Sequence, residues 1–151
     1  MNPLQRGLKL VGESPAWRVM GRIHAAVYRA TGGRIGHSAG RITNLLLTTT
    51  GRRSSQARTV PLAYLADGER FVVVASNGGA DRPPAWWTNL RAQPEATVQV
   101  GARVVPVVAR AATAAEHAVL WPRLTAVNPF FAQYEQITPR RIPVVVLEPR
   151  P

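Results

Sequence analysis

The sequence predicts an α+β protein, mainly β, in which five or six short strands form a small antiparallel barrel with an N-terminal helix and two inserted helices. Three observations support this fold class. Short apolar segments bounded by turn residues follow one another from about residue 44, and the strand-helix alternation of a doubly wound sheet is missing. The 151 residues suffice for one hydrophobic core but not for two. We expect one structural domain, with an N-terminal helical segment over 1–40 and the barrel over 41–151.

The first expected helix runs from Ser14-Pro15 to about Ala30. Serine followed by proline is typical of an N-cap with proline at the first helical position, and Gly32-Gly33 ends the pattern. Apolar side chains form a stripe along this helix, at Trp17, Met20, Ile23 and Val27. Packing of the stripe against the domain's own core is the commoner arrangement for such a helix. A helix that lies on a membrane surface is the alternative.

The strands of the barrel are recognised as short β-type segments between turn residues. We expect them over 44–50, 57–66, 70–76, 95–100, 103–110 and 143–148. Asp67-Gly68 is typical of a two-residue type I′ hairpin turn. Proline cannot donate a hydrogen bond to a neighbouring strand, so Pro106 indicates a strand at the edge of the sheet.

Two more helices are expected between these strands. Pro83-Pro84 begins a short helix that ends before Pro94. Thr113 and Glu116 form a capping-box pattern, in which each side chain satisfies the other's backbone donor, so the second helix runs over about 114–127. We expect a loop over 128–141.

The charge balance indicates an anionic partner. The 19 lysine and arginine residues exceed the 8 acidic ones by 11, which favours nucleic acid, anionic lipid or a polyanionic small molecule. The chain has no cysteine, which excludes disulfides, thiolate catalysis and cysteine-bound metal. No apolar run is long enough to cross a bilayer, and no secretory signal is recognisable. We therefore expect a soluble or surface-bound cytoplasmic protein.

The stretch from Leu45 to Leu62 is an apolar strand that breaks at Gly51 into a basic, hydroxyl-rich turn and then resumes as a strand. The turn comprises Arg52, Arg53, Ser54, Ser55, Gln56, Ala57 and Arg58. Backbone N–H groups, hydroxyls and guanidinium groups in one small concavity can hold phosphate or clustered carboxylates. The turn is no Walker loop, because it lacks the second glycine and the lysine, and it does not match the dinucleotide GxGxxG pattern.

The usual catalytic groups are missing from the sequence. His24, His37 and His117 are dispersed without metal-ligand spacing, and no paired carboxylates occur, so we expect no metal. The protein therefore either binds without catalysing or uses a cofactor that carries the reaction. Hydride transfer suits the second case, since it needs two stacked reactants shielded from water and little acid–base help.

Four segments in the same order and spacing resemble the deazaflavin-dependent nitroreductase family, the quinone- and nitroimidazole-reducing branch of the flavin/deazaflavin oxidoreductases. They are 45–61, Ala75-Ser76-Asn77-Gly78-Gly79, Ala85-Trp86-Trp87-Thr88-Asn89-Leu90 and 141–149. The resemblance implies a split, FMN-binding-like β-barrel and the use of reduced F420, a 5-deazaflavin with a phosphate and an oligoglutamate tail.

The resemblance also implies which residues bind the cofactor. Arg52, Arg53, Arg58, Ser54 and Ser55 would hold the phosphate and nearby carboxylates by charge-assisted hydrogen bonds. The full predicted set is Thr48, Arg52, Arg53, Ser54, Ser55, Gln56, Ala57, Arg58, Pro61, Ser76, Asn77, Gly78, Gly79, Trp86 and Asn89. For Trp86, packing in the core is an equally good interpretation of its helix. The family often has glycine at the position of Ser55 and lysine at that of Asn77, so a cofactor contact is altered here.

On the acceptor side, the resemblance implies contacts from Trp17, Ala63, Asn128, Phe131 and Tyr134. Tyrosines of the family's well-studied nitroreductase correspond to Ala63, Asn128 and Phe131, whereas the tyrosine matching Tyr134 is retained. We expect hydride transfer from reduced F420 to a quinone-like acceptor, with nitroaromatic acceptors less favoured. Ser76 and Tyr134 are the candidate catalytic residues, as hydrogen-bond donors to the acceptor oxygen. The segment 128–134 could equally be a hydrophobic lid over the core.

Other functions remain open at this point. A related split barrel could use FMN, or bind F420 as a non-catalytic carrier. A basic nucleic-acid-binding module is a further alternative, but Phe71, Trp86 and Phe131 do not alternate with basic positions as a stacking platform requires. The expected partner is a small-molecule electron acceptor and not nucleic acid. Peripheral contact of the basic N-terminal helix with the inner face of the membrane is the alternative to core packing, and the sequence leaves the oligomeric state undetermined.

Overall fold

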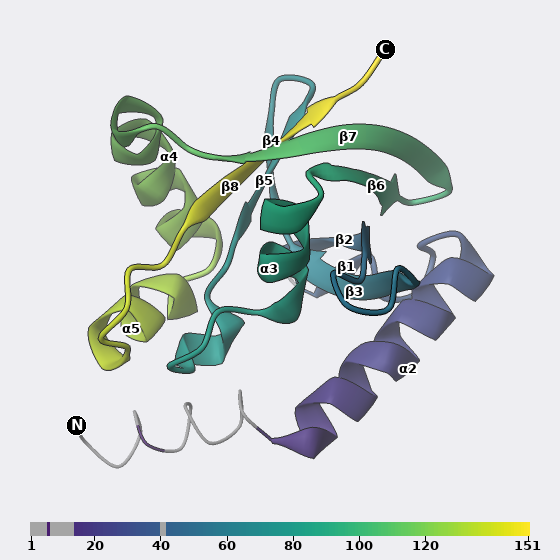
Figure 1. The fold of residues 1–151 in the computed structure, drawn as a ribbon, viewed down its shortest axis with the longest axis horizontal. Helices are drawn as coiled ribbons and strands as arrows, with labels where there is room; N and C mark the ends of the chain where they lie inside the picture. Colours follow the sequence, from purple (N-terminus) through teal and green to yellow (C-terminus); the bar gives the residue numbers. More distant parts are fainter. Residues whose placement is uncertain (1–5, 7–13, 40–41) are drawn as a thin grey trace.

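The computed structural model describes residue 6 and residues 14–39 and 42–151. Its strands are all paired antiparallel, in the order β1-β2-β6-β7-β8-β5-β4, with β3 paired to β2 (Figure 1). The strands are β1 Ser38–Ala39, β2 Ile42–Thr50, β3 Ala57–Ala63, β4 Leu65–Asp67, β5 Arg70–Val74, β6 Glu95–Val100, β7 Arg103–Ala111 and β8 Val144–Pro149. The order does not close on itself, which confirms the predicted split antiparallel barrel.

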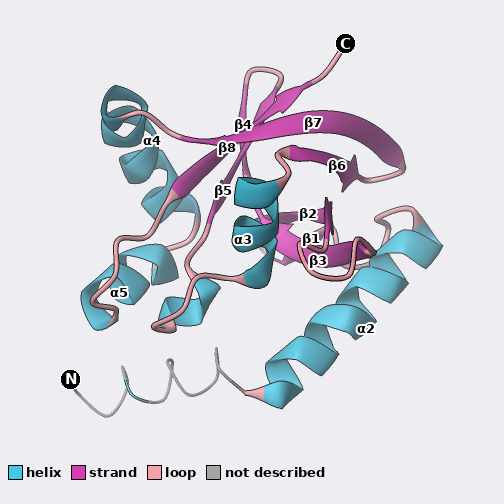
Figure 2. Ribbon diagram, viewed as in Figure 1, coloured by secondary structure: helices cyan, strands magenta, loops and turns pink. Residues whose placement is uncertain are grey.

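Helices cover both faces of the strands β5 and β8 (Figure 2). They are α2 Pro15–Thr31, α3 Ala85–Ala92, α4 Ala114–Val127 and α5 Phe130–Ile137, with a short 3-10 turn at Asn77–Gly79. On one face, Trp86 and Leu90 of α3 pack in a core cluster with Val73. On the other face, the second core cluster joins side chains of α4 and α5 to Val72 and Val74. Since successive strand residues point to opposite faces, burial on both sides explains the uninterrupted apolar run of β5.

The helix α2 is attached to the sheet through Tyr28. Its side chain is fully buried, and its hydroxyl accepts a hydrogen bond from Gly101 N at 2.8 Å and lies 3.2 Å from Asn44 O. The predicted cap is confirmed, because Ser14 Oγ accepts from Trp17 N at 3.3 Å, and Gly32 ends the helix with a φ of 59°.

The apolar stripe of α2 does not pack against the core, so that interpretation of it was wrong. The exposed fractions of its side chains are 47% for Trp17, 63% for Met20, 59% for Ile23 and 36% for Val27. The helix instead turns Ala25 and Tyr28 toward Leu46 of the sheet. No helix in the described ranges is both long and apolar enough to span a bilayer.

Several local predictions need correction. The expected loop 128–141 contains the helix α5. The sequence analysis overlooked two signals for this helix, the proline at its start, Pro129, and the apolar spacing that follows. The strand with Pro106 lies inside the sheet between β6 and β8, opposite the end of β8. Pro106 O still accepts from Arg150 N at 2.8 Å, so the proline forgoes only the donor that it lacks. The hairpin turn consists of Gly68 and Glu69, and only Gly68 has a positive φ, of 60°, so the turn is not of type I′. The strand expected over 57–66 is divided at Tyr64.

Candidate functional site

The basic turn between β2 and β3 is tightly closed by its own backbone. Gly51 N donates to Gln56 O at 2.8 Å, and Ser55 N donates to Gly51 O at 2.8 Å. Ser54 folds inward, so that its Oγ accepts from Gln56 N at 3.2 Å. A Cβ on Gly51 would lie 2.6 Å from that Oγ, which explains why glycine begins the turn. Local hydrogen bonds therefore fix the shape on which the arginines are presented.

The three arginines of this turn point into solvent without carboxylate partners. Arg52, Arg53 and Arg58 are exposed, and none forms an ion pair with an acidic residue in the described part of the chain. Among the described residues, Arg58 is the one of the three whose side chain has a hydrogen-bond partner, through a long bond of 3.5 Å from Nη2 to Ser54 Oγ. Like charges on one turn repel each other, and a bound anion would relieve that repulsion. The arrangement fits the predicted grip on a phosphate or carboxylates.

Asn89 of α3 anchors this turn to the body of the domain. Its side chain is only 5% exposed, its Oδ1 accepts from Arg52 N at 3.1 Å, and its Nδ2 donates to Thr49 Oγ1 at 3.1 Å. Trp86 lies one turn earlier on the same helix and is 6% exposed within the first core cluster. The structure thus gives both residues packing roles, and their contact with a cofactor stays a prediction.

A cavity of about 340 Å³ lies beside the turn. It is lined by the predicted residues Thr48, Ser55 and Ala57 together with residues at the start of β6. Thr48 Oγ1 lies 2.8 Å from Thr59 Oγ1, and Arg29 of α2 donates to the same Thr59 Oγ1 at 2.8 Å. Pro61 lies further along β3, opposite Leu46 of β2. The turn, β2 and β6 therefore border an open depression, and its lining also includes Glu95 and Arg150.

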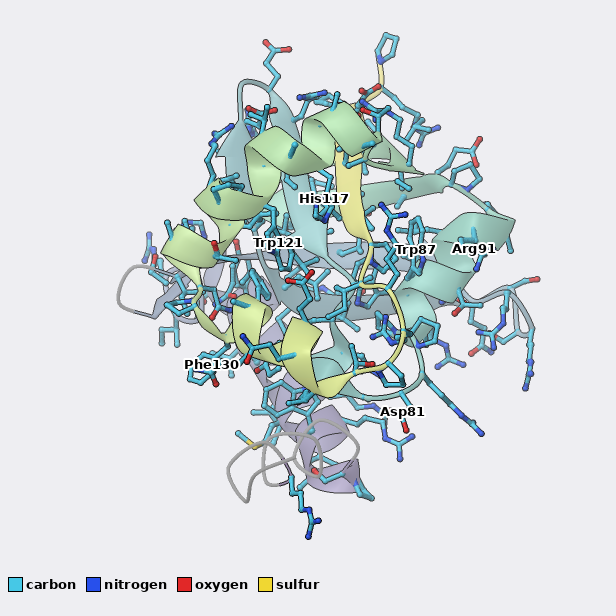
Figure 3. All side chains as sticks on the ribbon, turned by 90° about the vertical axis from the view of Figure 1, so that its left-hand side faces the viewer. Asp81, Trp87, Arg91, His117, Trp121 and Phe130 are labelled. Atoms are coloured by element: carbon cyan, nitrogen blue, oxygen red, sulfur yellow. The ribbon has the colours of Figure 1, made fainter. Side chains whose placement is uncertain are left out.

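The second predicted binding segment is the loop that follows β5. Asn77, Gly78 and Gly79 have φ angles of 48°, 61° and 79°, so three consecutive residues adopt left-handed backbone. A Cβ on Gly79 would lie 2.6 Å from Ile137 Cδ1 and 3.4 Å from Tyr134 Cδ1. Glycine is required there because the loop lies directly against α5. In Figure 3, which looks onto α4 and α5, Phe130 lies at the start of α5 and the loop residue Asp81 near its other end.

Three of the predicted acceptor residues come together. Ala63, Phe131 and Tyr134 belong to the second core cluster or pack against it. Asn128 lies between α4 and α5, where its Oδ1 accepts from Phe130 N at 3.1 Å. Trp17 is half exposed on α2 and belongs to none of the core clusters found among the described residues.

The two candidate catalytic hydroxyls are available for a ligand. Neither Ser76 Oγ nor the Tyr134 hydroxyl forms a hydrogen bond with any group in the described ranges. Neither oxygen is completely buried. Burial raises the pKa of Tyr134, which keeps its phenol protonated and able to donate. Its ring stacks on Phe130, with the ring centroids 6.2 Å apart. Each hydroxyl could therefore donate to an acceptor oxygen.

The histidines have structural partners. His24 Nε2 lies 2.7 Å from Gly36 O, His37 Nδ1 lies 3.1 Å from the Tyr28 hydroxyl, and His117 stacks on Trp121. Across the described residues, no group of three or more histidine, cysteine or acidic side chains could hold a metal ion. Sequence reasoning missed Arg140 and Thr138, which hydrogen-bond the loop after β5, because both fall in the segment expected to be unstructured.

Comparison with known proteins decides the family. The model of the family described as F420H(2)-dependent quinone reductase matches residues 19–149. The chain belongs to this family. An F420H(2)-dependent quinone reductase of Mycobacterium tuberculosis is 42% identical over 133 residues, which cover 85% of this chain and 89% of that protein. Membership in the F420H(2)-dependent quinone reductase family confirms the predicted enzyme class and the predicted cofactor.

Solved structures agree with this assignment. The structure of an F420-H2 dependent reductase has a TM-score of 0.65 and 36% identity, and the match covers 70% of this chain and 93% of that one. A structure described as a domain-swapped dimer has a TM-score of 0.67 and 32% identity over 89% of this chain and all of that one. The charge of Arg52, Arg53 and Arg58 suits an anionic cofactor, and their contact with one stays a prediction.

Proposed function

We propose that this protein transfers a hydride from reduced F420 to a quinone-like acceptor, and that its β2–β3 turn binds the anionic part of the cofactor. The observation that carries this proposal is the set of three exposed arginines that have no carboxylate partner in the part of the chain that the structure describes, Arg52, Arg53 and Arg58. A phosphate or glutamate carboxylate can accept two parallel hydrogen bonds from one guanidinium group. The net charge of +11 would also steer such a polyanion toward the protein.

The acceptor would occupy the side formed by the loop after β5 and by α5. Reduced F420 supplies the hydride when it is bound. Ser76 and Tyr134 would donate hydrogen bonds to the acceptor oxygen on which negative charge develops, and water would supply the one proton that, with the transferred hydride, completes the hydroquinone. Ala63 and Phe131 make this side apolar, which suits a flat lipophilic quinone. A nitroaromatic acceptor remains the alternative, with fewer phenol donors to bind it.

Cofactor choice is tested by titrating the purified protein with F420, FMN and a short oligonucleotide at low and moderate salt, read by fluorescence. We expect F420 to bind most tightly, with affinity falling as salt rises, because the contacts are ionic. Binding of FMN in preference to F420 would overturn the proposal. Preference for the oligonucleotide would indicate the nucleic-acid-binding alternative instead.

Catalysis is tested by mixing the protein with reduced F420 and a soluble quinone analogue. The absorbance band of oxidised F420 should reappear, and it should do so faster than in a mixture without protein. Reappearance with a nitroaromatic but not with a quinone would change the proposed acceptor. If F420 binds but no acceptor restores the band, the protein is a carrier and not a reductase.

For the source of the quinone, we propose an anionic lipid surface contacted by α2 at the inner face of the membrane. The exposed side chains Met20 and Ile23 form an apolar face on this helix. The helix has arginines and no acidic residue between Pro15 and Thr31, so its charge complements anionic lipid. An apolar face with arginines beside it is typical of helices that lie in the membrane interface.

Membrane contact is tested by sedimentation with vesicles of phosphatidylglycerol mixed with phosphatidylcholine, compared with phosphatidylcholine alone. The protein should sediment with the anionic vesicles, and a Met20→Ser, Ile23→Ser double variant should remain in solution. Val119→Ser is the matched control, because Val119 is 64% exposed on α4, which lies on the opposite side of the molecule from α2 (Figure 1). An equal loss of vesicle binding in the control variant would contradict this contact, and so would binding that shows no preference for anionic vesicles.

A further inference from the structure

The side chain of Arg140, which lies between α5 and β8, donates hydrogen bonds to backbone carbonyls of the loop after β5. Its Nη2 donates to Ser76 O at 2.8 Å and to Ala75 O at 3.1 Å, and its Nε donates to Ala80 O at 3.0 Å. One guanidinium group thus contacts three carbonyls that flank the segment Asn77–Gly79. None of these contacts was foreseen from the sequence.

The segment that Arg140 brackets has an unusual backbone. Its three consecutive positive φ angles include that of a non-glycine residue, Asn77, at 48°. Its local bonds are those from Gly79 N to Ser76 O at 2.9 Å, from Ala80 N to Asn77 O at 3.1 Å and from Asn77 Nδ2 to Arg82 O at 3.0 Å. Conformations of this kind persist only where the surroundings determine them strongly. The three bonds from Arg140 supply such a constraint.

The same contacts join the loop to α5. Thr138, directly after α5, donates from Oγ1 to Ala80 O at 3.3 Å, so Ala80 O is shared with Arg140. The missing side chain of Gly79 leaves room for Ile137 and Tyr134. Ser76 and Tyr134 therefore lie on two segments that Arg140 and Thr138 bind together.

The chemistry of the side chain suits this task. A guanidinium group presents several donors in a rigid planar fork, whereas lysine offers one ammonium that cannot span separated carbonyls. Arg140 is half buried, and burial lowers its pKa while the nearby Asp81 opposes that shift. Its neighbour Arg141 is exposed and makes no side-chain hydrogen bond with the described residues. Burying part of a charge has a cost that an exposed arginine avoids.

We propose that Arg140 is a positioning residue for hydride transfer, because it fixes the Ser76–Gly79 loop against α5 and so sets Ser76 relative to Tyr134. The inference rests on the proposed function and adds a residue that acts through the backbone of the loop after β5. The loop also carries the predicted cofactor contacts over Asn77–Gly79, so loss of Arg140 should weaken F420 binding to some extent. Because the proposed ionic grip of the β2–β3 turn is untouched, the rate in the bound complex should fall more than the affinity. Small displacements of reacting groups can lower a rate about 100-fold.

The kinetic test compares Arg140→Ala and Arg140→Lys with Arg141→Ala, which removes the same charge one residue away. In single-turnover reactions of bound reduced F420 with a quinone analogue, Arg140→Ala should lower the rate roughly tenfold or more. Its F420 dissociation constant should change less than about threefold. Arg140→Lys should recover little of the rate, and Arg141→Ala should match the unaltered protein. A normal rate in Arg140→Ala, or full recovery with lysine, would overturn the proposal.

A second measurement needs no cofactor. Amide hydrogen exchange should accelerate at Gly79 and Ala80 in Arg140→Ala, while exchange in β5 and β8 and the Tm stay close to those of the unaltered protein. A uniform increase across the sheet, with a large drop in Tm, would make Arg140 a general stabiliser and overturn the proposal. If Arg140→Ala does not fold, Arg140→Lys is judged by the same two measurements.

These measurements separate the two proposals. Failure of the unaltered protein to bind F420 would contradict the proposed function, whereas the exchange experiment would still test the loop. In the other outcome, the unaltered protein binds F420 and turns over normally while both Arg140 variants keep its reaction rate and its amide exchange. That outcome would contradict only the positioning role.

Discussion

Two groups of arginines in this protein have opposite surroundings. Arg70, Arg110 and Arg123 pair with carboxylates of β4, α4 and β8, whereas Arg52, Arg53 and Arg58 of the β2–β3 turn have no such partner among the described residues. Arg110 contacts Glu116 at 2.6 Å and Glu148 at 2.9 Å, and Arg123 contacts Asp67 at 2.9 Å. The chain has only 8 acidic residues, so their placement determines which arginines are neutralised.

The comparison shows how one residue type serves two purposes. The paired group joins strands and a helix that are distant in sequence, since Arg70 and Glu116 are 46 positions apart. The unpaired group leaves its hydrogen-bond donors available to an anion from solution. We therefore expect substitutions in the paired group to change stability and those in the unpaired group to change cofactor binding.

The largest effect is expected from the double change Arg52→Ala, Arg53→Ala. Loss of two charge-assisted contacts should weaken F420 binding roughly 100-fold, because each is worth about 1.5–3 kcal/mol before the remaining arginine compensates. The Tm should change by less than about 2 °C, since exposed side chains without partners contribute little to folding. Fluorescence titration and thermal melting measure the two quantities.

Arg110→Ala is the matched control, with F420 affinity expected within about threefold of the unaltered protein. Equal losses of affinity and Tm in the double variant would instead make the turn arginines structural.

Sequence reasoning found this turn because its signals are local. The glycine, the hydroxyls and the arginines all lie within Gly51–Arg58, and the hydrogen bonds that close the turn join residues at most five positions apart. The bond from Arg52 N to Asn89 Oδ1 of α3 is the long-range exception, and the sequence did not indicate it. The capping box is another local signal, and it is confirmed by bonds from Thr113 N to Glu116 Oε1 at 2.9 Å and from Glu116 N to Thr113 Oγ1 at 3.2 Å. The apolar strands likewise followed from short-range patterning.

Long-range contacts could not be predicted in this way. Glu116 also accepts from Arg70 and Arg110, and nothing in the capping pattern indicates those partners. The exposure of Met20 and Ile23 depends on which face of α2 meets the sheet, and Tyr28 determines this through bonds to residues up to 73 positions away. Arg140 was overlooked for the same reason, because its carbonyl partners precede it by 60 positions or more.

The next largest effect is expected from acid, which removes the whole paired group at once. Hydrogen bonds from Arg123 and Arg70 lower the pKa of Asp67, and those from Arg110 and the Thr113 backbone lower that of Glu116. When folding lowers the pKa of a carboxyl group, the ionised group stabilises the fold at pH values above its ordinary pKa, which is 3.8 for Asp67 and 4.5 for Glu116. This stabilisation disappears as the pH falls through the lower, folded-state pKa.

The Tm should accordingly be flat from about pH 7 to 5 and should fall steadily below that. Thermal melts at a series of pH values, at constant ionic strength, measure the slope. In Arg110→Ala the fall should be shallower, because the pKa of Glu116 then lies closer to its ordinary value. An identical slope in both proteins would show that this ion-pair network does not determine acid stability.

A smaller effect is expected from Arg110→Ala at neutral pH. The guanidinium group donates to two carboxylates on α4 and β8, and its removal leaves these like charges next to each other. Because the groups are partly exposed, the Tm should fall by only roughly 2–4 °C. Melting with and without 1 M salt checks the cause, since screening should reduce the difference between the two proteins. A difference that persists in high salt would indicate lost packing of the arginine stem instead.

The smallest effect is expected from Ser55→Gly, which alters the backbone of the unpaired group without touching an arginine. Ser55 has a φ of 59°, a left-handed conformation that costs a non-glycine residue about 1–2 kcal/mol. Glycine avoids this strain but loses about 0.5–1 kcal/mol more conformational entropy on folding, so the net gain should be roughly 0.5 kcal/mol and the Tm should rise by about 1–2 °C. F420 affinity should change less than about threefold if the arginines provide most of the grip. A clear loss of affinity with a raised Tm would instead assign a direct cofactor contact to the Ser55 hydroxyl.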